Sequence, residues 1–277
     1  VHRDFIVEER LPGLVACSLF PAPQLLATGT LRDAIEWPYL VLEESRGTAV
    51  RDLRDKLTPD DLIDIAEQVG FHLRALHSLD RSRVPELNRS ISEWEAWATS
   101  RLEAVPEELA RVTAPDGKPF LPASLLSELT TFLRSTGTAI IASTAGDDLF
   151  LIHGDITEDH VPVVPENSQD APNRLEAIFD FGDAEVAPVY YEWVPVWFSL
   201  LRQDRRAFRA HFERYHQSSW AQPGHQLTRF SERDILLTFT FVHRFSAAMV
   251  KETLSRDNAR FGELRSPGDL ADVLWPL

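Results

Sequence analysis

Two short apolar segments, each leading into an acidic residue, constrain this chain more than any other feature. The first, Leu149–Ile152, leads into His153-Gly154-Asp155, and the second, Ile178-Phe179, leads into Asp180. Short apolar runs bounded by turn residues predict buried strands, so both acids are expected at strand ends in one cleft. Two carboxylates in such a cleft suit phosphoryl transfer. One accepts the proton of the attacking hydroxyl, and the other holds the magnesium that bridges the nucleotide phosphates.

These motifs resemble the aminoglycoside phosphotransferase family of small-molecule kinases. In that family the catalytic loop reads His-Gly-Asp, four residues, Asn, and an Ile-Asp-Phe/Trp strand follows downstream. This chain has His160 at the Asn position, as do macrolide phosphotransferase-like members of the family. The resemblance implies ATP as the donor, Asp155 as the catalytic base, His153 as a brace of the loop, and Asp180 with His160 as Mg²⁺ ligands. Because Mg²⁺ prefers oxygen ligands, a structural loop histidine is the alternative role for His160.

An apolar segment near the start of the chain ends in two further acids. Trp37 to Glu44 predicts a buried strand, and residues 45–48 predict the turn after it. The resemblance implies that this segment is the hinge whose backbone binds adenine, with Leu42, Glu43 and Glu44 facing the nucleotide. An ordinary edge of a mixed sheet is the alternative interpretation.

The amino-terminal part of the kinase pattern is not visible in the sequence. A complete kinase of this fold has a glycine-containing loop over the phosphates and a strand lysine near its start. The first 44 residues contain no lysine and no glycine-rich turn. We therefore expect an α+β, protein-kinase-like two-lobe fold with an incomplete amino-terminal lobe (residues 1–44) and a mainly helical carboxy-terminal lobe (residues 45–277). A fragment, a degenerated lobe and a displacing insertion all account for the missing parts.

The carboxy-terminal lobe is expected to consist mainly of helices. Thr58 supplies a capping hydroxyl, and it is followed by a proline and two acids suited to a first helical turn. Apolar residues then recur at helical spacing up to Leu76. A polar loop over residues 165–174 is expected between the two acid-bearing strands. Further helices are expected over residues 91–105, 121–141, 192–201, 205–217 and 231–255.

Composition narrows the classes of protein and of partner. The single cysteine, Cys17, excludes an internal disulfide framework and favours a reducing compartment. There is no apolar run of about 18 residues and no signal-peptide pattern at the start, so we expect a cytoplasmic protein outside the membrane. The net charge of −15 argues against nucleic-acid binding and is compatible with a cationic small molecule. Solubility explains the acidity equally well.

The resemblance implies an ATP-dependent kinase that phosphorylates a hydroxyl group of an aminoglycoside-, macrolide- or related natural-product-like acceptor, with a role in antibiotic resistance. Two alternatives are open. A non-catalytic kinase-like binding or regulatory module follows if the missing parts are truly lost, although the presence of both Asp155 and Asp180 argues against it. An iron(II) oxygenase would use His153, Asp155 and a second histidine, but such triads lie in β-barrels and this chain is predicted to be largely helical. The candidates for that second histidine are His211, His216, His225 and His243.

Overall fold

The computed structural model describes residues 9–11, 13–15, 19–113, 117, 119–144, 148–164, 173–216, 227–256 and 264–276. Most of the loop predicted over residues 165–174 lies outside these ranges. The chain divides into two compact units built from segments that are distant in sequence. Unit 1 comprises Val1–Asn88, Phe150–Ala187 and Pro195–Gln222, and unit 2 comprises Arg89–Leu149, Pro188–Val194 and Pro223–Leu277. The site residues predicted for the kinase interpretation all belong to unit 1. The lobe boundary after residue 44 stays a prediction.

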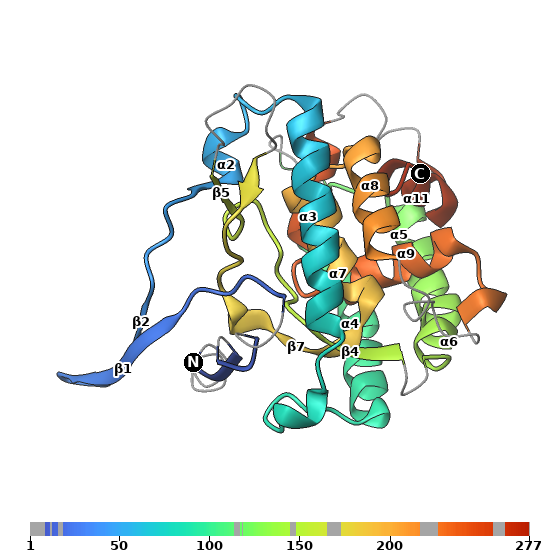
Figure 1. The fold of residues 1–277 in the computed structure, drawn as a ribbon. Helices are drawn as coiled ribbons and strands as arrows, with labels where there is room; N and C mark the ends of the chain where they lie inside the picture. The colour runs from blue at the N-terminus through green and yellow to red at the C-terminus, as the bar shows by residue number, and fades with distance from the viewer. Residues whose placement is uncertain are drawn as a thin grey trace. The chain divides into compact units, whose positions relative to one another are not determined.

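The helical part of unit 1 is a pair of helices, α3 (Pro59–His77) and α8 (Arg205–Tyr215), which lie side by side (Figure 1). α3 begins as predicted, because Thr58 and Asp61 form a capping box. The Thr58 hydroxyl oxygen accepts a hydrogen bond from the Asp61 amide, and the Thr58 amide donates one to the Asp61 carboxylate. Gly70 of α3 approaches the main-chain carbonyl of His211 so closely that a Cβ atom would clash with the oxygen. Glycine therefore sets how near the two helices approach.

Strands β1 (Leu25–Arg32) and β2 (Glu36–Leu42) form an antiparallel hairpin, a two-stranded sheet that contains the predicted hinge strand (Figure 1). The register pairs Leu31 with Trp37 and Gly29 with Tyr39. The predicted strand is present, but its predicted burial is wrong, since Trp37 is 54% exposed and Tyr39 is 40% exposed. An apolar run leads to burial only where a second layer covers it, and this face of the hairpin is exposed.

Two small sheets form the strand framework around the candidate site. β4 (Leu149–Ile152) is the strand predicted before the first acid, and it pairs with β7 (Glu185–Pro188). The second sheet has the strand order β3-β5-β6 and is antiparallel throughout. Its members are β3 (Thr48–Ala49), β5 (Pro162–Val164) and β6 (Arg174–Leu175). The remaining short elements of unit 1 are α2 (Val50–Leu53), η1 (Arg81–Arg83), η4 (Phe181–Asp183) and η5 (Val196–Leu200).

The strand predicted at Ile178-Phe179 is not formed, so this prediction was wrong. The segment is irregular, because its amides pair with carbonyls of two loops and not with a neighbouring strand. The Ile178 amide donates to the Pro21 carbonyl at 2.7 Å, and the Phe179 amide donates to the His160 carbonyl at 3.0 Å. The apolar pattern correctly indicated buried backbone, but it could not distinguish a strand from an extended segment held by loops.

Unit 2 is helical, and its core is aromatic. Trp94 is fully buried, and its ring is parallel to the ring of Phe239 with centroids 6.4 Å apart. The helix predicted over 121–141 is three successive segments, the middle one a π-helical turn, and the helix predicted over 231–255 is broken in two after Val242. Within the described residues, no helix combines the length and apolar character needed to cross a membrane. The elements are α4 (Ile91–Arg111), α5 (Ala123–Phe132), η2 (Leu133–Gly137), α6 (Thr138–Ile141), α7 (Val189–Pro195), η6 (Leu227–Arg229), α9 (Glu232–Val242), α10 (Ser246–Arg256) and α11 (Pro267–Leu274).

Candidate active site

The loop after β4 turns sharply at Gly154. Gly154 has φ of +82°, a backbone conformation that residues with a Cβ atom rarely adopt. A Cβ atom here would lie 2.6 Å from the main-chain oxygen of Asp183. Glycine is therefore required for two reasons at once, backbone conformation and close approach. The turn sets the direction in which the chain leaves β4 and therefore the position of Asp155.

His153 joins the two sequence motifs through its ring. Its Nε2 lies 2.9 Å from the Phe179 carbonyl oxygen, and its Nδ1 lies 3.3 Å from the backbone nitrogen of Asp155. A carbonyl oxygen only accepts and an amide only donates, so Nε2 carries the proton and Nδ1 accepts. The side chain is fully buried. This histidine holds the loop after β4 against the Phe179 segment, while its part in catalysis stays a prediction.

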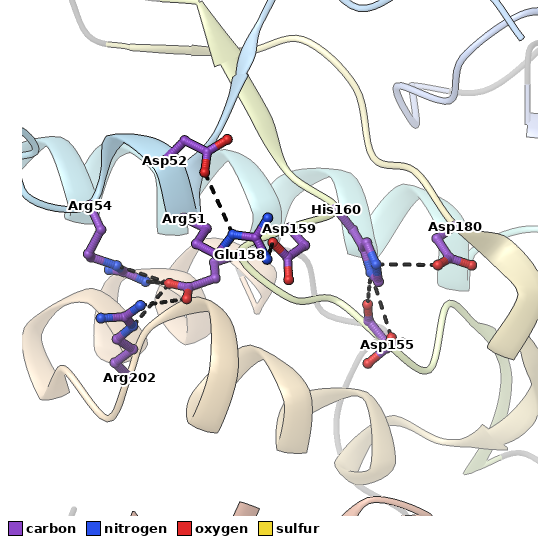
Figure 2. Close-up of polar contacts among 9 residues, drawn as sticks. All are labelled: Arg51, Asp52, Arg54, Asp155, Glu158, Asp159, His160, Asp180 and Arg202. Carbon is purple, nitrogen blue, oxygen red and sulfur yellow. Dashed lines mark hydrogen bonds and ion pairs between the residues drawn. The ribbon is translucent and has the colours of Figure 1, made fainter. Parts of the chain in front are cut away.

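His160 lies between the two acids that the sequence analysis singled out (Figure 2). Its Nδ1 is 2.8 Å from the main-chain oxygen of Asp155 and 3.7 Å from that residue's carboxylate oxygen Oδ2. Its Nε2 is 3.3 Å from Oδ2 of Asp180. The structure thus brings together three of the predicted site residues, Asp155, His160 and Asp180, although 25 positions separate the two acids in the sequence.

Asp180 has an unusual backbone that turns its carboxylate toward this cluster. Its φ is +67° and its ψ is +71°, and its side chain caps η4 by accepting a hydrogen bond from the Gly182 amide at 3.4 Å. A non-glycine residue in this left-handed region is uncommon, although aspartate adopts it more readily than most residues. The Asp180 side chain is 53% exposed, against 16% for Asp155. The more exposed carboxylate is the one better placed to receive a ligand from solvent.

The donor set fits a divalent cation that is shared with a nucleotide. The carboxylate of Asp180 offers oxygen ligands of the kind that Mg²⁺ prefers, and Nε2 of His160 lies beside it. Within the described residues, no group of three or more His, Cys, Asp or Glu side chains is arranged to hold a metal ion alone. Mg²⁺ usually takes one or two protein carboxylates and completes its shell with waters and substrate phosphates, so this cluster suits a nucleotide-bound cation better than a permanent structural metal.

A cavity of about 320 Å³ lies beside the predicted hinge. Its lining includes Glu43 and Glu44 on one side and Phe179, the residue immediately before Asp180, on another. Leu42, the third predicted nucleotide-facing residue, is half-buried at the end of β2 and is not among the described residues that line this cavity. The cavity therefore joins the hinge to the segment that carries Asp180. Its lining is completed by Ala22, Pro23, Ser45, Arg46, Val164, Arg174, Glu176 and Ala177.

Glu176 fixes the turn that follows the hinge. The Ser45 hydroxyl donates to Oε2 of Glu176 at 2.6 Å, and the Gly47 amide donates to the same oxygen. The hydrogen bond from Ser45 is the main reason that the pKa of Glu176 is lowered from its usual range. The charged carboxylate holds this turn against β5 and β6 of the cavity wall.

A partly buried ion cluster supports the far end of the loop that carries Asp155, and it was not predicted from the sequence. Glu158 accepts hydrogen bonds from Arg202 at 2.6 and 3.0 Å and from Arg54 at 3.0 and 3.2 Å (Figure 2). Burial raises the pKa of Glu158, but the hydrogen bonds from the two arginines outweigh it and the pKa is lowered overall. The arginines lie 104 and 44 positions away, so no local pattern in the sequence identifies the cluster.

The geometry argues against the iron(II) oxygenase hypothesis. Both ring nitrogens of His153 are used by main-chain groups, so neither offers a lone pair to a metal. Of the proposed further ligands, His211 is buried with its Nδ1 3.3 Å from the Ala66 carbonyl, and His225 lies outside the described residues. The pair His153 and Asp155 is therefore a loop brace and an acid, and it does not form two corners of a metal triad.

Comparisons with known proteins agree with the motifs. Residues 8–227 match the family model of the phosphotransferase enzyme family, APH. The GDP and kanamycin complex of APH(2″)-IIIa matches with a TM-score of 0.62 at 20% identity, covering 98% of this chain and 82% of that one. Macrolide 2′-phosphotransferase type I matches with a TM-score of 0.51 at 16% identity, covering 93% of this chain and 79% of that one. These likenesses show a protein-kinase-like fold and confirm the predicted fold class.

Among curated proteins, the lysine-specific demethylase JMJ21 of Arabidopsis thaliana is 25% identical over 224 residues, or 70% of this chain. The chain spans only 23% of that protein's length. The family match extends over most of the chain and includes both acid-bearing motifs and the predicted hinge. The chain therefore belongs to the phosphotransferase enzyme family.

Proposed function

We propose that this protein is a small-molecule kinase that transfers the γ-phosphoryl group of ATP to a hydroxyl group of an aminoglycoside-, macrolide- or related natural-product-like acceptor. The observation that carries the proposal is the convergence of Asp155 and Asp180 on His160 beside the hinge cavity. A base, a cation site and a nucleotide-sized space are the three parts that phosphoryl transfer needs.

The residues have separate tasks in this proposal. Asp155 accepts the proton of the acceptor hydroxyl as its oxygen forms a bond to the γ-phosphorus, while the bond from that phosphorus to the β,γ-bridging oxygen breaks and ADP leaves. Asp180 and His160 hold Mg²⁺, which when bound neutralises charge on the phosphates. Leu42, Glu43 and Glu44 face the base of the nucleotide, with Glu43 and Glu44 at the cavity wall. His153 keeps the loop in place through its two main-chain hydrogen bonds.

The choice of acceptor rests on the family and on charge. One of the solved structures described above is a complex with kanamycin, and the other is a macrolide 2′-phosphotransferase. With a net charge of −15, the chain attracts polycationic molecules over long range and repels anionic ones. A cationic, hydroxyl-bearing natural product is therefore the acceptor class that we propose. We further propose that the enzyme acts in the cytoplasm and contributes to antibiotic resistance. The chain covers under a quarter of the demethylase relative, so that activity is not carried over.

The test is a phosphorylation assay with wild type, Asp155→Ala and a matched control on the same loop. The control is Asp159→Asn, because the Asp159 carboxylate pairs with Arg51 at 2.6 Å and takes no part in the His160 cluster (Figure 2). With ATP, Mg²⁺ and a panel of aminoglycosides and macrolides, we expect turnover in wild type and control and a loss of about 10²–10⁴-fold in Asp155→Ala. Calorimetry should show Mg-ATP binding in Asp155→Ala and weak or no binding in Asp180→Ala.

Two results would change the proposal. Near-normal turnover by Asp155→Ala would remove it as the base and refute the mechanism. Nucleotide binding without turnover on any acceptor would favour the non-catalytic kinase-like module. Parallel assays with GTP distinguish the nucleotide donors, since the kanamycin complex above contains GDP.

A further inference from the structure

The hydrogen bonding of His160 determines which of its ring nitrogens faces Asp180. Nδ1 lies 2.8 Å from the main-chain oxygen of Asp155, and because this oxygen can only accept, Nδ1 carries a proton. In the neutral ring the lone pair is then on Nε2. That nitrogen lies 3.3 Å from Oδ2 of Asp180, an oxygen that also carries lone pairs.

Two lone-pair atoms this close repel each other unless a proton on Nε2 or a bound cation lies between them. The spacing matches a shared metal ion. In octahedral coordination with bonds of 2.0–2.1 Å, two adjacent ligand atoms lie about 3 Å apart. The distance of 3.3 Å between His160 Nε2 and Asp180 Oδ2 is close to that value. The two side chains are therefore spaced to serve as one edge of a coordination shell without any change of rotamer.

The edge is held by main-chain hydrogen bonds. The amide of Phe179, next to Asp180, donates to the carbonyl of His160 itself at 3.0 Å, and the His160 amide donates to the Thr157 carbonyl at 3.2 Å. The ring is mostly covered, with 18% of the side chain exposed. Because backbone and ring are both fixed, the nitrogen is presented to the cation by the fold and is not brought there by a flexible side chain.

We propose that His160 sets the metal preference of this cation site, and that it shifts the site away from Mg²⁺ toward divalent transition-metal cations. This inference rests on the proposed function, since the cation is the one that accompanies the nucleotide. Mg²⁺ is a hard cation that prefers oxygen, whereas an imidazole nitrogen binds first-row transition metals with affinity rising from Mn²⁺ through Co²⁺ to Ni²⁺. An Asn in the same position offers an amide oxygen, which gives no such advantage.

The test compares wild type with His160→Asn for cation binding in the presence of a non-hydrolysable ATP analogue. Calorimetry gives the affinity for Mg²⁺, Mn²⁺, Co²⁺ and Ni²⁺, and the visible spectrum of Co²⁺ reports a nitrogen ligand independently of activity. We expect the variant to lose on the order of tenfold in Co²⁺ affinity, more for Ni²⁺ and less for Mn²⁺, with Mg²⁺ affinity unchanged or improved. The Co²⁺ absorption band should move to longer wavelength when the nitrogen is removed.

His72→Asn is the matched control. The Nδ1 of His72 also lies close to a main-chain carbonyl, that of Leu19 at 2.6 Å, but this residue is on α3 and outside the cluster. It should leave every cation affinity unchanged. His160→Gln serves as a second variant in case the Asn variant folds poorly.

The outcomes separate this inference from the proposed function. Equal ratios of Co²⁺ to Mg²⁺ affinity in wild type and His160→Asn, with tight nucleotide-dependent binding in both, would overturn the role of His160 and leave the kinase proposal standing. No cation-dependent nucleotide binding in wild type, and no effect of Asp180→Ala, would overturn both.

Discussion

Replacing Gly154 by alanine tests whether the close approach after β4 holds the catalytic loop in place. The substitution adds one methyl group to a residue with φ of +82°, and this group would lie 2.6 Å from the Asp183 oxygen. Two costs follow from the structure, one from backbone strain and one from the contact. The strain of a left-handed conformation is about 1–2 kcal/mol for a residue with a Cβ atom.

The contact adds to that cost. An ordinary separation between carbon and a carbonyl oxygen is about 3.3 Å, so the two segments must part by roughly 0.7 Å. Overpacking of this kind costs about 1–3 kcal/mol. The expected total for Gly154→Ala is therefore about 2–5 kcal/mol of lost stability. The same displacement moves Asp155, and a shift approaching 1 Å at a reacting group costs on the order of 100-fold in turnover.

Gly117→Ala is the control that isolates the contact. Gly117 has a similar φ of +79°, but a Cβ atom there would meet nothing within 4 Å. It should lose only the strain, about 1–2 kcal/mol, and keep full activity. Urea unfolding of wild type and both variants, with phosphorylation measured in parallel, gives the comparison. Equal destabilisation of the two variants, or full activity of Gly154→Ala, would refute the argument that the Asp183 carbonyl fixes this turn.

Two further substitutions, and one control, test interactions that hold unit 1 together. Glu158→Gln should lower stability at pH 7 by about 2–3 kcal/mol, less than a fully buried pair because Arg202 is 40% exposed. Because the pKa of Glu158 is lowered in the folded protein, its contribution is present above the ordinary value of 4.5 and is lost as the pH falls below it, so urea unfolding should show the two proteins converging in acid. A difference in unfolding free energy that does not shrink as the pH falls below 4.5 would contradict this. Gly70→Ala should destabilise by about 1–3 kcal/mol through the clash with the His211 carbonyl, whereas Gly268→Ala in α11, whose nearest neighbour lies at 3.5 Å, should stabilise by about 0.5–1 kcal/mol in thermal unfolding.

The sequence predicted well those features that depend on local chemistry. The start of α3 at Thr58 follows from capping alone, and helices were also predicted where α4 and α8 lie, although α4 continues six residues beyond its predicted end. The β4 strand and the loop acid Asp155 were also predicted, because a short apolar run followed by a glycine turn is a strong local pattern. The family followed from the spacing of the two motifs, which reflects the chemistry that they share.

Features that depend on distant partners could not be predicted in the same way. The Phe179 segment was predicted as a strand, but its hydrogen-bond partners are two loops, one of them more than 150 positions away. The exposed face of β2 depends on what covers it, which an apolar pattern does not state. The Glu158 cluster joins three segments that are distant in the sequence. The position of His160 between the two acids is seen only in the three-dimensional structure.

The hydrogen bond between the Phe179 amide and the His160 carbonyl involves main-chain atoms alone. It is therefore present whatever side chain occupies position 160. A mutation there changes the chemistry offered to a ligand while the distance between the two loops is retained. The spacing of the two loops and the chemical group offered at position 160 can therefore change independently. Natural variation at this position can replace the chemical group while the main-chain hydrogen bond keeps the loops together. Under the role proposed for His160, a small number of substitutions would adapt the same loops to a different metal supply.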